Sequence, residues 1–204
     1  MPVYDAILFD LDGVLLDSEP VHWACWAEVL RPLGIHLTWE LYRDRFVGVI
    51  QPEMLRYLAA HCHPPRDWNE LWAQFPAKRQ LFRQRMAAAP AFHPALDGLL
   101  GELHAHYKLA VVSSTFSPEV ELVLEAGKLR RHFDLVVGGD HVRQPKPAPD
   151  AYLLAASRLG AHAPLVVEDS EAGIASGRAA GFEVLAVSGP AEVPERLRRI
   201  VPCT

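Results

Sequence analysis

The sequence predicts an α/β fold: an open parallel β-sheet between two layers of helices, with a helical subdomain inserted into it. Short apolar runs rich in β-branched residues alternate with helical patterns along most of the chain. This alternation is typical of a parallel sheet that is covered on both faces. A stretch of about seventy residues, from 18 to 88, shows helical periodicity without a strand-like run. Connections in such folds are normally much shorter, so this stretch indicates an insertion.

Five apolar runs are expected to form the strands: residues 6–9, 108–112, 134–137, 164–168 and 183–187. Helical patterns follow three of them, over about 117–129, 148–160 and 170–181. Gly127, Gly160 and Gly181 stand where these helical patterns end. Glycine is favoured there because it readily adopts the left-handed conformation that ends a helix. The residues after 187 leave open whether a further helix completes the sheet edge.

Residues 18–88 are expected to form the helical subdomain, and residues 1–17 with 89–204 are expected to form the sheet domain. All five tryptophans lie in the helical stretch: Trp23, Trp26, Trp39, Trp68 and Trp72. Packing is the simplest explanation for most of them, because large aromatic side chains dominate the energetics of small cores.

Composition and charge exclude several classes of function. The chain has 204 residues, a formal net charge of −5 and an isoelectric point near 6, whereas a nucleic-acid-binding domain is basic. No apolar run approaches the ~20 residues of a membrane span, and the first residues lack the basic segment of a secretion signal. Cys25, Cys62 and Cys203 are far apart and form no paired motif, which favours a reducing compartment. We therefore expect a cytoplasmic monomer or weak homodimer that binds neither nucleic acid nor membrane.

Polar side chains follow four of the predicted strands at the point where each strand ends. Because ligands of open parallel sheets bind beyond the carboxyl ends of the strands, these side chains are expected to meet at one edge. Any one of them could instead be a loop residue or a helix cap, but their convergence predicts a site. They are Asp10 and Asp12, then Ser113, Ser114 and Thr115, then Lys146, and finally Glu168 and Asp169.

This set of side chains indicates phosphate chemistry. Oxygen ligands without histidine or cysteine suit a hard cation such as Mg²⁺, which also offsets the repulsion among carboxylates. A lysine and hydroxyl groups complement an anion with several acceptor oxygens, as phosphate is. One aspartate can attack phosphorus, and a second carboxyl can protonate the leaving oxygen and later accept a proton from water.

Four segments resemble motifs of the haloacid-dehalogenase-like hydrolase superfamily, and more closely its branch of β-phosphoglucomutase and phosphoglycolate-phosphatase-like enzymes. They are DLDGVLLDSE (10–19), VVSST (111–115), KPAPDAY (146–152) and VVEDSEAGI (166–174). The resemblance spans nearly the whole chain. It implies a Rossmann-like three-layer core and an α-helical cap, residues 18–88, that closes over the site and excludes water.

The resemblance also implies roles for the acidic residues. Asp10 would be the nucleophile and a Mg²⁺ ligand. Asp12 would be the general acid and base, and its backbone carbonyl would be a second ligand. Glu168 and Asp169 would complete the metal site, and Gly13 would permit the tight turn after the first strand.

In the same family pattern, Ser113 and the amide of Ser114 would bind the transferring phosphoryl group, and Lys146 would neutralise it. The acid at position 12 distinguishes two chemistries. Dehalogenase-type members lack an aspartate there, since a leaving halide needs no proton. Asp12 therefore favours phosphate esters over haloacids.

His22 and Trp26 are the first candidates for substrate contact in the helical stretch. They are four residues apart, so they share a face of a helix. Both positions resemble those of β-phosphoglucomutase, where the histidine lies at the entrance of the active site.

The chain departs from the family pattern at Val49 and Gln51, where basic residues are common. The arginine with which a mutase grips a second phosphate is absent there, and Gln51 stands in its place. Lys78 or Arg79 could replace it from another helix. This departure favours a phosphatase over a mutase.

The sequence thus predicts a Mg²⁺-dependent phosphatase that hydrolyses a small phosphorylated metabolite, a sugar phosphate or similar, through an aspartyl-phosphate on Asp10. Two alternatives stay open. One is a phosphomutase of the β-phosphoglucomutase type, which would use the same intermediate. The other is a non-catalytic phosphate-binding or regulatory protein, against which Asp12 argues, because binding alone has no need of a proton donor.

Overall fold

The computed structural model describes residues 4–47 and 49–201, and its fold confirms the α/β prediction. Cys203 lies outside the described residues. The chain divides into two compact units, Met1–Asp17 with Ala89–Thr204, and Ser18–Ala88. Within the described ranges, none of the helices is both long enough and apolar enough to cross a lipid bilayer.

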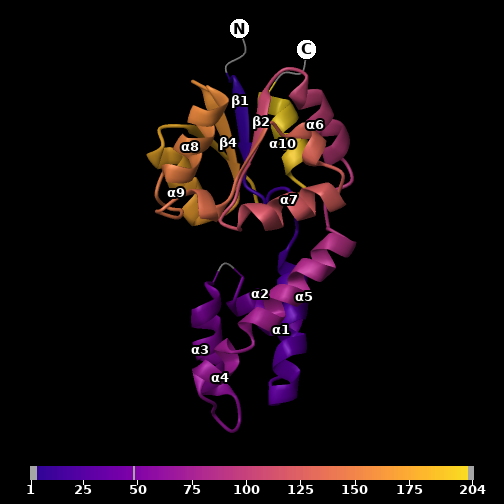
Figure 1. Cartoon of the computed structure of the whole chain (residues 1–204), viewed down its shortest axis with the longest axis vertical. Helices are drawn as coiled ribbons and strands as arrows, with labels where there is room; N and C mark the ends of the chain where they lie inside the picture. Colours follow the sequence, from indigo (N-terminus) through magenta and orange to yellow (C-terminus); the bar gives the residue numbers. More distant parts are fainter. Residues whose placement is uncertain (1–3, 48, 202–204) are drawn as a thin grey trace. The chain divides into compact units, whose positions relative to one another are not determined.

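The larger unit contains a five-stranded sheet with the order β3-β2-β1-β4-β5, in which all neighbouring strands are parallel (Figure 1). Its strands are β1 (Ala6–Phe9), β2 (Lys108–Val112), β3 (Leu135–Val137), β4 (Pro164–Glu168) and β5 (Glu183–Ala186). They coincide with the predicted runs to within one residue at each end. Every residue of β1 and β4 is buried, which explains why these runs are continuously apolar.

Helices cover both faces of this sheet (Figure 1). One face carries α8 (Asp150–Leu159) and α9 (Glu171–Ala179), and the other carries α6 (Leu96–His104), α7 (Ser117–Ala126) and α10 (Val193–Ile200). Short 3₁₀ turns, η2 (Arg130–His132) and η3 (Gly139–His141), flank β3. The sequence left open whether a further helix follows the last strand. Helix α10 follows β5 and buries Val193 and Leu197.

Two of the three glycines expected to end helices have the predicted conformation. Gly160 and Gly181 have φ values of 62° and 81°. A helix also ends at Gly127, as predicted, because this residue is the C-cap of α7, but its φ is −80° and Lys128 takes the left-handed conformation, with φ 60°. A Cβ atom at Gly127 would lie 2.3 Å from the ring of Phe92. Close packing, and not the turn, therefore requires a glycine at this position.

The smaller unit is helical over its described residues. It contains α1 (Glu19–Leu30), η1 (Arg31–Leu33), α2 (Trp39–Arg45), α3 (Gln51–His61), α4 (Trp68–Trp72) and α5 (Phe75–Ala88). Its core includes Trp26, which is 1% exposed, and the other four tryptophans pack partly buried against that core. Packing therefore accounts for the position of all five tryptophan rings.

The strand order of the larger unit positions the predicted site. The chain builds the sheet outward from β1 through β2 to β3, and then crosses to the other side of β1 for β4 and β5. Such a reversal leaves a crevice at the carboxyl ends of the two strands that flank it. Because Phe9 of β1 pairs with Val167 of β4, the next residues, Asp10 and Glu168, emerge side by side.

Candidate active site

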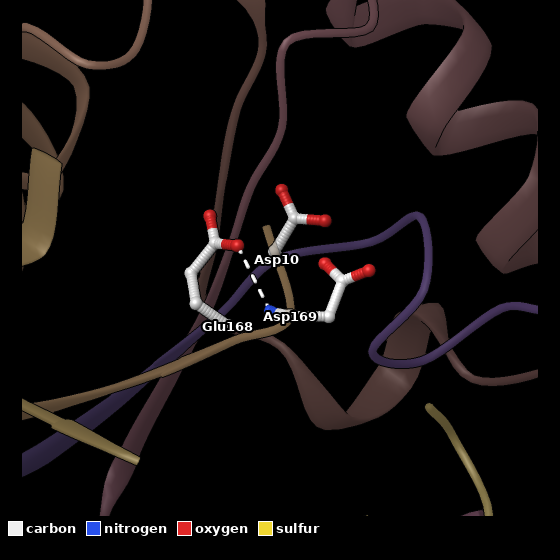
Figure 2. A group of neighbouring side chains, drawn as sticks. All are labelled: Asp10, Glu168 and Asp169. Atoms are coloured by element: carbon white, nitrogen blue, oxygen red, sulfur yellow. Dashed lines mark hydrogen bonds between the residues drawn. The ribbon is translucent and has the colours of Figure 1, made fainter. Parts of the chain in front are cut away.

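Three acidic side chains meet at the carboxyl ends of β1 and β4. Carboxylate oxygens of Asp10, Glu168 and Asp169 lie within 4.8 Å of one another. Figure 2 shows the three side chains beside each other, with the backbone amide of Asp169 donating to the Glu168 carboxylate. Glu168 is fully buried and Asp10 is 8% exposed. The structure thus brings together the acids that follow two different strands.

Lys146 joins this group from the segment between β3 and α8. Its Nζ atom donates to Asp10 Oδ1 and to Glu168 Oε1, both at 2.6 Å, and to the backbone oxygen of Val112 at 2.9 Å. These bonds use all three protons of the ammonium group. Lys146 therefore ties together the ends of β1, β2 and β4.

Glu168 is held from both sides. Its Oε1 atom accepts from Lys146 and from the hydroxyl of Tyr152, at 2.7 Å. Its Oε2 atom accepts from the Asp169 amide and from the Ser170 amide and hydroxyl, at 3.1 to 3.3 Å. Tyr152 is the last residue of the segment KPAPDAY, but the sequence pattern predicts no role for it. Direct binding of a metal by Glu168 would compete with these bonds.

The pKa values of the cluster reflect burial first and the neighbouring charges second. Burial raises the pKa of Asp10 well above its usual range; Lys146 offsets this only in part, while Glu168 and Asp12 raise it further. Burial, followed by the charge of Glu168, raises the pKa of Asp169 to about 6. Burial lowers the pKa of Lys146, but Asp10 and Glu168 outweigh it, so the net shift is upward.

The donor set fits a hard divalent cation. Several carboxylates face one ammonium group, and the protein relieves this imbalance only by protonation or by binding a cation. All the side-chain ligands are oxygens, as Mg²⁺ prefers. Asp10 and Asp169 can turn free lone pairs toward such an ion.

Asp12 lies apart from this group of three carboxylates. It accepts a hydrogen bond of 3.3 Å from the hydroxyl of Thr115, which comes from the loop after β2. Gly13, the next residue, has a φ of +80°, and a Cβ atom there would lie 2.0 Å from Asp169 Oδ2. Only glycine permits this close approach of the two loops.

The loop after β2 contains the predicted phosphate-binding residues. The Ser113 side chain is buried, and its Oγ atom accepts from the amide of Thr115 at 3.0 Å. Ser114 is exposed at the surface of the loop. Thr115, which lay in the quoted motif but had no predicted role, positions Asp12. The expected contact of Ser113 and Ser114 with a phosphoryl group stays a prediction.

Three of the residues predicted to contact substrate gather in the smaller unit. The Nδ1 atom of His22 accepts from Lys78 Nζ at 2.6 Å, and the His22 ring stacks on Phe82 with centroids 4.1 Å apart. Burial, followed by the charge of Lys78, lowers the pKa of His22 to about 3. The ammonium group also lies 5.7 Å from the ring centre of Trp26. His22 is therefore a neutral acceptor that orients a buried lysine.

Gln51 lies on another helix, at the start of α3. Its Oε1 atom is buried, and it has no hydrogen-bond partner among the described residues. Buried polar atoms are nearly always paired, so this oxygen is available to a donor outside the chain. Val49, at the other position that departs from the family pattern, is 37% exposed.

Comparison with known proteins agrees with the geometry. Residues 7–187 match the model of the family described as haloacid dehalogenase-like hydrolase. The chain is 31% identical to the phosphorylated carbohydrates phosphatase of Thermotoga maritima over 182 residues, which cover 88% of this chain and 82% of the relative. It is also 31% identical to the fructose-1-phosphate phosphatase YqaB of Escherichia coli over 186 residues, which cover 90% and 96%.

A solved structure extends the comparison to three dimensions. The CbbY protein of Rhodobacter sphaeroides, in complex with phosphate, superimposes with a TM-score of 0.71 and 29% identity, over 91% of this chain and 87% of that one. The family match includes the sheet, the carboxylate cluster and the helical insertion. The chain belongs to the haloacid dehalogenase-like hydrolase family.

Proposed function

We propose that this protein is a Mg²⁺-dependent phosphatase that hydrolyses a small phosphorylated metabolite, a sugar phosphate or similar, through an aspartyl-phosphate on Asp10. One observation carries the proposal: Asp10, at the end of β1, lies 2.6 Å from Lys146 and beside Glu168 and Asp169. The relatives named as phosphatases of phosphorylated carbohydrates and of fructose 1-phosphate support the substrate class.

The proposed first step transfers the phosphoryl group to the protein. A carboxylate oxygen of Asp10 forms the new bond to phosphorus as the bond to the ester oxygen breaks. Asp12 donates a proton to that leaving oxygen. Ser113 and the Ser114 amide hold phosphoryl oxygens, and Lys146 neutralises their charge.

The second step returns Asp10 to its free form. Asp12, now ionised, removes a proton from water, whose oxygen attacks phosphorus and releases inorganic phosphate. Asp10, Asp169 and the backbone carbonyl of Asp12 would hold Mg²⁺, with Glu168 beside it. When bound, the ion supplies charge neutralisation for the phosphoryl oxygens.

We propose that residues 18–88 act as the cap of this enzyme, with His22, Gln51 and Lys78 as its substrate-side residues. The buried, unpaired oxygen of Gln51 and the His22–Lys78 pair support this role. Trp26 is better explained as the packing support behind Lys78. We also propose a cytoplasmic location, on the basis of the scattered cysteines, and a monomer or weak homodimer.

Replacing the nucleophile tests the proposal. Asp10→Asn should lower hydrolysis of p-nitrophenyl phosphate in Mg²⁺ by roughly 10³-fold or more, because an amide is a far weaker nucleophile than a carboxylate. Acid quenching during turnover of ³²P-labelled substrate should trap label on the wild-type protein and not on the variant. Asp44→Asn, at an exposed position of the smaller unit, is the matched control. Full activity of Asp10→Asn would refute the proposal.

A phosphatase and a phosphomutase are distinguished by the products that they form. With β-glucose 1-phosphate and a bisphosphate activator, a phosphatase releases free phosphate, whereas a mutase yields the 6-phosphate isomer. The uncharged residues at positions 49 and 51 favour release. A protein that binds phosphate and Mg²⁺ but turns over none of a broad panel of esters would be a binding protein.

A further inference from the structure

A cavity of about 250 Å³ lies beside the candidate active site, lined by residues of the larger unit alone. Three of its lining residues, Ser113, Ser114 and Lys146, belong to the predicted phosphate site. The remaining wall is mainly apolar, with Phe116, Val142 and Pro145, and has one cationic side chain, Arg143. The cavity therefore continues outward from the phosphate site with a different chemical character.

The backbone around Phe116 is firmly fixed. The amide and hydroxyl of Ser117 donate to the Asp140 carboxylate at 2.7 and 2.6 Å, and the Gly139 amide donates to the Thr115 oxygen at 3.0 Å. A Cβ atom at Gly138 would lie 2.3 Å from the Ser117 nitrogen, so the two loops are in close contact. On this rigid support the Phe116 ring stays 51% exposed.

An exposed aromatic ring at a fixed position adds little to the core. It does offer a flat apolar surface to a molecule in the cavity, at little entropic cost because its backbone is already ordered. The Arg143 guanidinium, with five N–H donors and no acceptor, lines the same cavity. Together they complement a ligand that has both C–H groups and oxygen acceptors.

The leaving group of the proposed reaction has to lie close to this loop. Thr115, the residue before Phe116, donates to the Asp12 carboxylate at 3.3 Å. Asp12 is the group that would protonate the leaving oxygen, so the carbon skeleton attached to that oxygen extends past Thr115. Phe116, the next residue along the chain, lines the cavity.

Building on the phosphatase function proposed above, we propose that this cavity binds the leaving group, and that Phe116 and Arg143 select a compact sugar or polyol. The C–H face of such a group packs on the Phe116 ring, and Arg143 donates to its hydroxyl oxygens. The volume of about 250 Å³ lies below the roughly 300–1,000 Å³ of pockets for drug-sized ligands, which suits a leaving group of sugar size.

Steady-state kinetics on leaving groups of different size tests this assignment. Hexose, pentose and hexitol monophosphates reach into the cavity, whereas acetyl phosphate does not fill it. Phe116→Ala should raise KM for the best sugar or polyol phosphate about ten-fold, a discrimination that one hydrophobic contact supports. The loss on acetyl phosphate should be several-fold smaller. Phe116→Trp keeps an aromatic ring and should therefore have a KM close to that of the wild type. Arg143→Ala should raise KM for the same substrate.

Two surface substitutions are matched controls. Leu122→Ala removes an exposed apolar side chain of α7, and Arg158→Ala removes an exposed cation of α8; neither residue lines the cavity. Equal losses of Phe116→Ala on acetyl phosphate and sugar phosphates, or an unchanged KM, would overturn the inference. A preference for phosphoglycolate that depends on Arg143 would also overturn it, since it would show an anionic leaving group.

An experiment that refutes the role of the cavity can be told apart from one that refutes the phosphatase function. If wild-type protein turns over sugar phosphates and Asp10→Asn does not, the phosphatase stands whatever the result at Phe116. If the wild type hydrolyses none of the esters, the phosphatase and the leaving-group cavity are both refuted.

Discussion

Lys146 and Glu168 hold the candidate site together with hydrogen bonds that use most of their capacity. Lys146 has three protons and three acceptors, and Glu168 accepts on both oxygens. Removing either partner would leave a buried charge without compensation, which commonly costs several kcal/mol. The proposed chemistry falls mainly to Asp10 and Asp12, so at the scale of residues the proposed chemistry and the scaffold are carried largely by different side chains.

Asp12→Asn should separate protonation of the leaving group from attack on phosphorus. We expect hydrolysis of an alkyl ester such as a sugar phosphate to fall on the order of 10²- to 10⁴-fold, because its alkoxide needs a proton to leave. p-Nitrophenolate leaves without one, so p-nitrophenyl phosphate should still give a burst of about one equivalent before slow turnover. Rapid-quench kinetics measures both. Equal loss in the first step for the two esters would contradict the role of Asp12.

Gly13→Ala should damage both stability and activity. The added Cβ would meet Asp169 at 2.0 Å, and the φ of +80° is unfavourable for alanine. We expect a loss on the order of 1–3 kcal/mol in the free energy of unfolding, measured by denaturant titration, with weakened Mg²⁺ binding. Gly98→Ala, in helix α6 with open space around it, should be neutral or stabilising by about 0.5–1 kcal/mol.

At the scale of elements, the turn from β4 into α9 joins the fold to the site. Ser170 is the N-cap of α9, where its hydroxyl accepts from the Gly173 amide at 3.0 Å and donates to Glu168 at 3.1 Å. A Cβ atom at Gly173 would lie 1.8 Å from the Glu168 carboxylate. The first turn of this helix therefore packs directly against the acid that organises the cluster.

Ser170→Ala should destabilise the protein by about 1 kcal/mol, the usual value of a lost N-cap. Thr38→Ala removes the equivalent cap of α2, in the smaller unit, and should cost about the same. Thermal unfolding compares the two stabilities, and kcat compares their effect on the site. We expect only Ser170→Ala to lower kcat, because only Ser170 contacts Glu168. Equal kcat values would show that the cap serves the helix alone.

At the scale of the whole molecule, each of the two units has its own core. The larger unit alone contains the carboxylate cluster, the lysine and the cavity at Phe116. The smaller unit contains the His22–Lys78 pair and Gln51. In the proposed function, the larger unit therefore carries out the chemistry and the smaller unit selects the substrate. Phe116 and Arg143 would add a part of that selection from the larger unit.

Mg²⁺ should stabilise the whole protein through the carboxylate cluster. At a concentration about 100 times its Kd, we expect Tm to rise by roughly 5 °C, since the ion binds only the folded state. Asp169→Asn should raise Tm without Mg²⁺, because it relieves repulsion, and should shrink the rise on adding Mg²⁺. Differential scanning fluorimetry measures both, with NaCl at matched ionic strength and with EDTA as controls. A rise unchanged in Asp169→Asn would place the ion elsewhere.

The amino-acid sequence by itself was enough to predict the strands, their parallel arrangement and the acids at their ends. These features are local. A strand buried on both faces appears in the sequence as a continuous apolar run, and Asp10, Lys146 and Glu168 stand at recognisable positions near such runs. A packing requirement such as that of Gly127 against Phe92 has no local signal, so the sequence predicts the helix end at Gly127 but not the contact that requires a glycine there.

Only the tertiary structure determined which side chains contact one another in the candidate site. The saturation of Glu168 by Lys146 and Tyr152, the bond from Thr115 to Asp12 and the cavity at Phe116 join residues far apart in the chain. Their distances depend on strand order and register, which place the end of β1 between those of β2 and β4. Residue type and spacing carry the chemistry of each group, whereas proximity between groups arises only when the sheet has formed.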